Sequence, residues 1–235
     1  MTIQALVFDL DGTLVDQEGA ERDALMLLHS SELKLDPIPG FRDFLRVWRT
    51  AADDYLQRFL DNKMSFEDQR IQRFEAVYTA FNQNCPPGEA KRLHEAYVAH
   101  YRKQWRAFED TKPALEALKA AGYRLAVITN GDGAQQRAKM VATDILGYFE
   151  HVLASGDVKV AKPHADIFRH SEKALGLVPG ELAYVGDRLD ADVAGAKNAQ
   201  WTPIWLDRKS MPGGPGEPGV LVAQSLSELP ALLRA

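Results

Sequence analysis

The spacing of apolar residues changes twice along the chain. Residues 5–8 are all apolar and stop at the sequence DLDG at 9–12, which predicts a buried strand of a parallel sheet ending in a turn. From about Gln17 the apolar residues recur at i, i+3, i+4 and i+7, as in FRDFLRVW at 41–48, and this spacing is helical. We therefore expect an all-helical block of about four helices over residues 17–107.

After Trp105 short apolar runs alternate with segments of helical spacing. The runs predict strands and the segments between them predict helices, with Gly122 and Gly176 placed to end two of the helices. The 12 residues 208–219 hold four Gly and three Pro, which predicts a loop. The predicted strands are 124–129, 151–154, 182–185 and 202–205, and the predicted helices are 113–121, 135–141, 165–175, 190–199 and 225–233.

Alternating strands and helices predict an α/β fold, with a parallel sheet that carries helices on both faces. The strand at 5–8 cannot stand alone, so we expect it to join the sheet made by the C-terminal part of the chain. The helical block is then an insertion and not a preceding domain. The predicted division is a sheet unit of 1–16 plus 108–235 and a helical unit of 17–107. Ligands of such sheets bind beyond the carboxyl ends of the strands.

Composition narrows the classes of function. The 235 residues are 46% apolar, and 33 acidic against 28 basic side chains give a net charge of −5, as in ordinary globular proteins. The single cysteine, Cys85, excludes an intrachain disulfide and favours a reducing, cytoplasmic location. Because the sequence has no dense Lys/Arg run, no leader pattern and no long apolar window, we expect neither nucleic acid nor a membrane as partner. Whether the protein is a monomer or a homodimer is not determined by the sequence.

Polar side chains gather where the predicted strands end. Several carboxylates from separate loops form a hard-oxygen site suited to Mg²⁺. Glycines let backbone N–H groups approach an anion, and threonine hydroxyls and a lysine add donors. Two carboxylates two residues apart can act as nucleophile and general acid/base. The residues concerned are Asp9, Asp11, Gly12, Thr13, Thr129, Asn130, Gly131, Lys162, Asp187, Asp190 and Asp192.

Each of these residues also has an ordinary structural explanation. Thr129 alone is more often a β-branched strand end, and Lys162 alone is most often a solvated surface lysine. Asp190 fits a helix N-cap, and Asp192 fits an acid favoured by the dipole of the first helical turn. Only their joint placement at four strand ends favours a reactive site.

Four motifs in order resemble the haloacid dehalogenase (HAD) superfamily of phosphohydrolases. They are FDLDGTLVD at 8–16, VITNG at 127–131, AKP at 161–163, and VGD at 185–187 with Asp192 five positions on. The resemblance implies a Rossmann-like parallel core. A helical insertion directly after the first motif is similar to the C1 cap of that family.

The resemblance implies a mechanism in which Asp9 attacks phosphorus and carries an aspartyl-phosphate. Asp11 would protonate the leaving oxygen and then deprotonate the hydrolytic water. Asp9, the backbone carbonyl of Asp11 and Asp187 would hold Mg²⁺, with Asp192 as a further ligand or as a partner of the ligands. The spacing favours Asp192 over Asp190 for that second acidic role.

The resemblance also assigns residues to the phosphoryl group of a small phosphorylated metabolite. Cations and hydroxyl or backbone donors neutralise its oxygens during transfer. The expected substrate-binding residues are Thr13, Thr129, Asn130, Gly131 and Lys162. Arg188, where relatives often have a small polar residue, would either touch substrate or pair with an acid.

Three other functions compete with a phosphatase. A phosphomutase resembling β-phosphoglucomutase would use the same core and a similar cap. A haloacid dehalogenase is disfavoured by Asp11, because halide displacement needs neither Mg²⁺ nor an acid for the leaving group. A non-enzymatic phosphoacceptor domain is disfavoured by the length of the chain and by the helical insertion.

Overall fold

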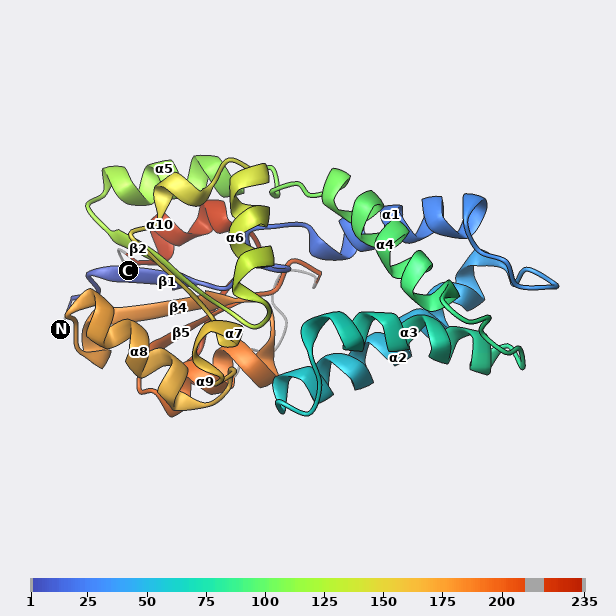
Figure 1. The fold of residues 1–235 in the computed structure, drawn as a ribbon. Helices are drawn as coiled ribbons and strands as arrows, with labels where there is room; N and C mark the ends of the chain where they lie inside the picture. The colour runs from blue at the N-terminus through green and yellow to red at the C-terminus, as the bar shows by residue number, and fades with distance from the viewer. Residues whose placement is uncertain (1, 210–217, 234–235) are drawn as a thin grey trace. The chain divides into compact units, whose positions relative to one another are not determined.

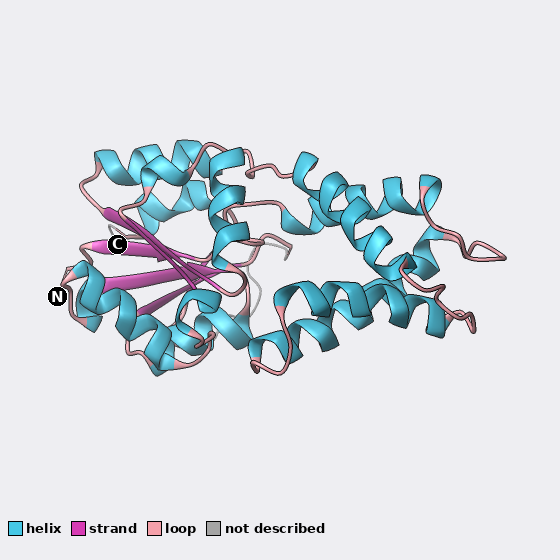
Figure 2. Ribbon diagram, viewed as in Figure 1, coloured by secondary structure: helices cyan, strands magenta, loops and turns pink. Residues whose placement is uncertain are grey.

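The structure is a computed structural model that describes residues 2–209 and 218–233. The chain folds into two compact units (Figures 1 and 2). The first unit combines the described residues up to Asp16 with those from Arg106 onward, and the second is the segment between them, Gln17–Trp105. No helix of the described residues is long and apolar enough to cross a membrane.

The first unit is built on a six-stranded sheet in the order β3-β2-β1-β4-β5-β6. Every neighbouring pair is parallel, so the predicted α/β class with a Rossmann-like parallel core is confirmed. The strands are β1 (Ala5–Phe8), β2 (Arg124–Thr129), β3 (His151–Ala154), β4 (Leu182–Gly186), β5 (Thr202–Leu206) and β6 (Leu221–Ala223).

Successive residues of β1 face opposite sides of the sheet, as the pleat requires. Leu6 and Phe8 belong to the apolar core formed with α5, α6 and α10, whereas Ala5 and Val7 belong to the core formed with α8 and α9. Figure 1 shows these two groups of helices on the two faces. The helices are α5 (Thr111–Ala120), α6 (Gly133–Ala142), α7 (Ser155–Val158), α8 (Ala165–Leu175), α9 (Ala194–Asn198) and α10 (Leu229–Leu232).

The register of β1 brings three strand ends to one edge. Phe8 is level with Val127 of β2 and with Val185 of β4. The next N–H group, that of Asp9, donates to the carbonyl of Val185 at 2.9 Å. Residues that follow these three strands therefore lie together at the carboxyl edge, which is where parallel sheets bind ligands.

The strand predictions for 124–129 and 151–154 are confirmed to the residue, and β4 and β5 each extend one residue further. The prediction of a single helix at 190–199 is wrong at its start, because Leu189–Val193 forms a π-helical turn before α9 begins. The short β6 and α7 were not expected. Short 3₁₀ helices also form at Leu146–Tyr148, Pro179–Glu181 and Leu226–Glu228. Most of the predicted loop 208–219 lies outside the described residues.

The second unit consists of helices packed around an aromatic core. Trp48 lies at its centre, with ring centroids 4.8 Å from Phe74 and 5.1 Å from Tyr97. Ser65 is the N-cap of the helix that begins at Phe66, since its side chain accepts from the N–H group of Asp68. The described helices are α1 (Gln17–Ser31), α2 (Phe41–Leu60), α3 (Phe66–Ala80) and α4 (Glu89–Lys103).

Candidate active site

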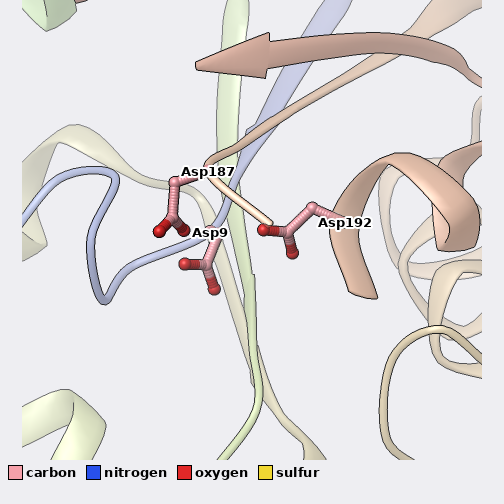
Figure 3. A group of neighbouring side chains, drawn as sticks. All are labelled: Asp9, Asp187 and Asp192. Carbon is pink, nitrogen blue, oxygen red and sulfur yellow. The ribbon is translucent and has the colours of Figure 1, made fainter. Parts of the chain in front are cut away.

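Three carboxylates meet at the carboxyl edge of the sheet. Asp9 follows β1, Asp187 follows β4, and Asp192 lies in the π-helical turn after it. One oxygen from each lies within 4.8 Å of the others, and Figure 3 shows the three carboxyl groups turned toward one another. Asp9 and Asp192 are buried. Like charges this close repel, so the cluster either binds cations or holds a proton on one of its acids.

Two glycines make room for these carboxylates. A Cβ on Gly186 would lie 2.4 Å from Cγ of Asp192, and a Cβ on Gly12 would lie 2.5 Å from Oδ2 of Asp187. Gly12 also has a positive φ of 86°, which side chains rarely adopt. The motif glycines are therefore required by the close approach of acid side chains to the backbone.

Gly12 and Gly131 are expected to let backbone N–H groups approach an anion, and their own N–H groups are already engaged. The N–H group of Gly12 donates to the carbonyl of Val15 at 2.9 Å, and that of Gly131 donates to Oγ of Ser155 at 2.9 Å. Among the described residues, the backbone N–H groups of Asp11 and Asn130 have no hydrogen-bond partner. These two are the better candidates for contact with phosphoryl oxygens.

Lys162 neutralises part of the acidic cluster. Its Nζ lies 2.6 Å from Oδ1 of Asp9, 2.6 Å from Oδ1 of Asp192 and 2.7 Å from the hydroxyl of Tyr184. Burial alone would lower the pKa of the Lys162 amine, but the two carboxylates outweigh it and the pKa is raised. The lysine therefore stays charged, and the explanation as a solvated surface lysine is wrong, because its side chain is buried.

One lysine does not neutralise three acids. Burial, and after it the charge of Asp192, raises the pKa of Asp187 to about 6. Burial also raises the pKa of Asp9 well above its usual value, against the opposing effect of Lys162. Hard carboxylate oxygens that are buried, close together and short of positive charge fit a divalent cation such as Mg²⁺. Asp9, Asp187 and Asp192 are the side chains that would hold it.

Asp11 lies apart from this cluster and is held by α6. Lys139, which is fully buried, donates from Nζ to Oδ1 of Asp11. Gln136 donates from Nε2 to Oδ2 of Asp11 at 2.8 Å and to Oγ1 of Thr129 at 2.7 Å. The three-acid group does not include the Asp11 carboxylate, so only its backbone carbonyl is left for the predicted role in metal binding.

Lys139 and Gln136 are the residues that sequence reasoning missed. Their helix was expected at 135–141, and the two are one turn apart on the same side of it. The signal in the sequence was a Gln-x-x-Lys pair shortly after VITNG at 127–131. A lysine and a glutamine on an amphipathic helix are ordinary surface residues, so the pattern alone did not single them out.

Thr13 and Asn130 hold other site residues in place. Thr13 is fully buried, and its hydroxyl donates to Oδ1 of Asp187 at 3.5 Å, so its position does not support the predicted contact with substrate. The side-chain amide of Asn130 donates to the carbonyl of Lys162 at 3.0 Å and accepts from its N–H group at 2.9 Å. These bonds fix the backbone from which Lys162 reaches the carboxylates.

The contacts of Asp190 and Asp192 show which of the two joins the acidic cluster. Asp190 is exposed and pairs with Arg188, whose Nη2 lies 2.6 Å from its Oδ2. It lies inside the π-helical turn and not at the N-cap. Asp192 is buried, accepts from the N–H group of Arg188 at 3.0 Å and contacts Lys162. Arg188 therefore pairs with an acid, and Asp192 is the acid that joins the cluster.

The profile of haloacid dehalogenase-like hydrolases matches residues 3–200 of the chain. Glyceraldehyde 3-phosphate phosphatase of Pyrococcus abyssi is 29% identical over 208 residues, which cover 87% of this chain and 81% of that protein. N-acylneuraminate-9-phosphatase of Rattus norvegicus is 29% identical over 241 residues, which cover 99% and 94%. Among solved structures, the HAD-hydrolase YfnB of Bacillus subtilis matches with a TM-score of 0.79 at 22% identity, covering 100% of both chains.

Proposed function

Because the chain belongs to the haloacid dehalogenase-like hydrolases, we propose that it is a Mg²⁺-dependent phosphatase of small phosphomonoesters that works through an aspartyl-phosphate. The observation that carries the proposal is the placement of Asp9. Its carboxylate lies at the carboxyl edge of the sheet among Asp187, Asp192 and Lys162, with Asp11 two residues on. Relatives of this chain act on glyceraldehyde 3-phosphate and N-acylneuraminate 9-phosphate by name.

The divalent cation would be held by Asp9, Asp187 and Asp192, with the backbone carbonyl of Asp11 as a further oxygen. When bound, Mg²⁺ draws phosphoryl oxygens to the site and neutralises the charge that develops on them. Lys162 already holds two of the three acids in position, and Trp205 donates from Nε1 to the carbonyl of Asp187 at 3.0 Å. The acids are therefore oriented by the protein itself.

Asp9 is the proposed nucleophile. A carboxylate oxygen of Asp9 forms a bond to phosphorus while the bond from phosphorus to the leaving oxygen breaks. Asp11 gives its proton to that oxygen as the alcohol departs. Asp11 then takes a proton from water as the water attacks phosphorus, which releases inorganic phosphate and restores the Asp9 carboxylate.

Lys139 and Gln136 are proposed to position Asp11 for this work. Each donates to a different oxygen of the Asp11 carboxylate, so the carboxylate cannot rotate freely. Gln136 also contacts Thr129 at 2.7 Å, which links the acid to the strand end that would face the phosphoryl group. Positioned acid–base groups of this kind contribute about 10²–10⁴-fold to rates.

The phosphoryl oxygens would be bound by Lys162 and by the unpartnered N–H groups of Asp11 and Asn130. Donors fixed in advance and aimed at developing charge cost no reorganisation during reaction. We further propose that the helical unit, Gln17–Trp105, acts as a lid that excludes water and selects the leaving group. The proposed setting is the cytoplasm, with a small phosphorylated metabolite as the partner.

The experiment that tests the activity is phosphate release from p-nitrophenyl phosphate and from a panel of about a hundred phosphorylated metabolites, with Mg²⁺ and with EDTA. We expect sustained release that requires Mg²⁺. A single stoichiometric phosphorylation without turnover would indicate a phosphoacceptor domain. Isomerisation of hexose phosphate that depends on a bisphosphate, with little phosphate release, would indicate a mutase.

A further inference from the structure

Two arginines of the helical unit are buried side by side on one helix. Arg70 and Arg73 lie on α3, one turn apart, and are 7% and 6% exposed. Residues three apart on a helix are neighbours on its surface. The pair therefore places two permanent positive charges close together inside the helical unit.

Neither arginine has an anionic partner. Among the described residues, no carboxylate lies within ion-pair distance of Arg70 or Arg73, and no hydrogen bond from either guanidinium is formed. The Nε atom of each is sealed from solvent without an acceptor. By contrast Arg92, near the other end of the unit, pairs with Glu32 at 2.6 Å and with Glu89 at 2.8 Å. Arg92 is only partly buried and is nonetheless paired, whereas a more deeply buried arginine needs a partner more.

Aromatic rings surround the two guanidinium groups. Cζ of Arg70 lies 4.6 Å from the ring centroid of Phe66 and 5.6 Å from that of Tyr97, and Cζ of Arg73 lies 5.7 Å from that of Trp48. Stacking of this kind orients a guanidinium and occupies its face, so that N–H groups at its edge can still donate to an anion. It supplies about 0.5–2 kcal/mol, well below the desolvation cost of an unpaired buried charge.

Glu21, whose charge acts on Arg73, is already engaged by neutral donors. Glu21 accepts from Nε1 of Trp48 at 3.1 Å and from the hydroxyl of Tyr97 at 3.4 Å. Burial, reinforced by Arg70, lowers the pKa of Arg73 despite the opposing charges of Glu21 and Asp53. Arginine stays protonated in proteins, so both guanidinium groups keep their charge without a direct ion pair among the described residues. His94 adds a buried Nδ1 without a partner.

From this pair we infer an oxyanion-binding site in the helical unit, in which the guanidinium groups of Arg70 and Arg73 bind a carboxylate or phosphate group. Planar guanidinium edges match such groups with paired hydrogen bonds. The anion is either part of the substrate or a separate small ligand. All residues of this proposed site belong to the helical unit, and the proposal does not depend on the chemistry proposed for Asp9.

Malonate is a suitable probe, because it offers carboxylates and no phosphoryl group. The thermal unfolding midpoint of the whole protein is measured against malonate, with sodium chloride at equal ionic strength as the reference. We expect the midpoint to rise by several degrees with malonate in the wild type, and the rise to be lost in Arg70→Gln and Arg73→Gln. The matched control is Arg58→Gln, since Arg58 also stacks on a ring, that of Tyr55 at 4.7 Å, but is exposed and paired with Asp54 at 2.7 Å.

Two results of the malonate experiment would contradict the proposed anion site. An equal rise in chloride and malonate, or a malonate rise that persists in Arg73→Gln, would mean that the two arginines do not form a specific oxyanion site. If the variants do not fold, the wild-type protein alone still tests the proposal. Equal rises of its unfolding midpoint in malonate and in chloride exclude a specific site. Without malonate we expect the Arg73→Gln midpoint to equal or exceed that of the wild type, since an unpaired buried charge has been removed. A large fall would indicate a purely structural role and contradict the inference.

Steady-state kinetics distinguish an anion that is part of the substrate from one that belongs to a separate ligand. In Arg70→Gln, a rise of about tenfold or more in KM for phosphoglycolate, with KM for p-nitrophenyl phosphate unchanged, assigns the anion to the substrate. Lost malonate binding with both KM values unchanged assigns it to a separate ligand. Both results support the site, and the malonate experiment remains valid if the protein proves not to be a phosphatase.

Discussion

The carboxylate of Asp11 is bound by the buried amine of Lys139, a residue 128 positions away on α6. Lys139 also lies 3.0 Å from Oε1 of Gln136, and Gln136 donates to the other oxygen of Asp11. The proposed acid–base residue is thus held by the sheet unit itself. Its two supporting side chains come from the helix that follows the strand carrying Thr129.

The Lys139→Met variant tests this support. We expect kcat to fall about 10- to 100-fold, because Asp11 loses a donor that fixes its carboxylate, with little change in KM. The loss should be larger for an alkyl phosphate than for p-nitrophenyl phosphate, since nitrophenolate departs without a proton. The comparison requires steady-state rates on both substrates.

Lys119→Met is the matched control for that experiment. Lys119 lies on α5, with its amine 5.7 Å from the ring centroid of Tyr148, and it has no role in the site. We expect unchanged kcat on both substrates. Equal losses on alkyl and aryl phosphates in Lys139→Met would show that Lys139 does not act through the acid.

Gly186→Ala tests the close packing of the acidic cluster. The added Cβ would lie 2.4 Å from Cγ of Asp192, so that Asp192 must move. We expect a loss of about 1–3 kcal/mol in the free energy of unfolding, as for other overpacked sites, and at least a tenfold loss of Mg²⁺ affinity. Calorimetry of Mg²⁺ binding and chemical denaturation measure the two effects.

The control for this substitution is Gly147→Ala. A Cβ at Gly147 meets nothing within 4 Å, and its φ is not positive. We expect stability and Mg²⁺ affinity like those of the wild type. Wild-type Mg²⁺ affinity in Gly186→Ala would refute the assignment of Asp192 to the metal site.

Mg²⁺ binding should depend on pH through Asp187. Burial, followed by the charge of Asp192, raises its pKa from 3.8 to about 6 in the folded protein. In the metal-free protein its contribution to stability is therefore full below pH 3.8 and is lost as the pH rises to about 6. Mg²⁺ binds the charged form and competes with the proton. We expect the increase in unfolding midpoint caused by Mg²⁺ to be several degrees larger at pH 7.5 than at pH 5.0.

Two variants serve as controls for the effect of Mg²⁺ on the unfolding midpoint. Asp192→Asn removes an acid of the cluster and should abolish most of the Mg²⁺ effect at both pH values. Asp190→Asn removes the exposed acid that pairs with Arg188 and should leave the effect intact. A Mg²⁺ effect equal at the two pH values would mean that Asp187 does not hold the ion.

The sequence predicted the parts of the site that follow directly from strand ends. Asp9 and Asp187 come immediately after buried strands, and parallel pairing brings those ends together whatever the rest of the fold does. Asp192 required the five-residue spacing of the resemblance, because periodicity alone made it an ordinary first-turn acid. Its position depends on the π-helical turn, which local patterns do not reveal.

Contacts between residues far apart in the chain could not be predicted from local sequence patterns. Lys139 appeared as an ordinary helical lysine, and its burial depends on how α6 packs on the sheet. The sequence predicts that Gly131 binds substrate but does not show that its N–H group donates to the hydroxyl of Ser155 at 2.9 Å. Trp48, Phe74 and Tyr97 form part of the core of the helical unit. The unpaired Arg70 and Arg73 on the same core became visible only from its packing.

The most direct test of the proposed mechanism is kcat of Asp9→Asn on p-nitrophenyl phosphate with saturating Mg²⁺. The amide keeps the shape of the side chain but cannot form the aspartyl-phosphate, so we predict a loss of at least about 10³-fold with a cooperative unfolding transition like that of the wild type. A folded Asp9→Asn variant that keeps more than a tenth of the wild-type kcat would contradict the assignment of Asp9 as the nucleophile.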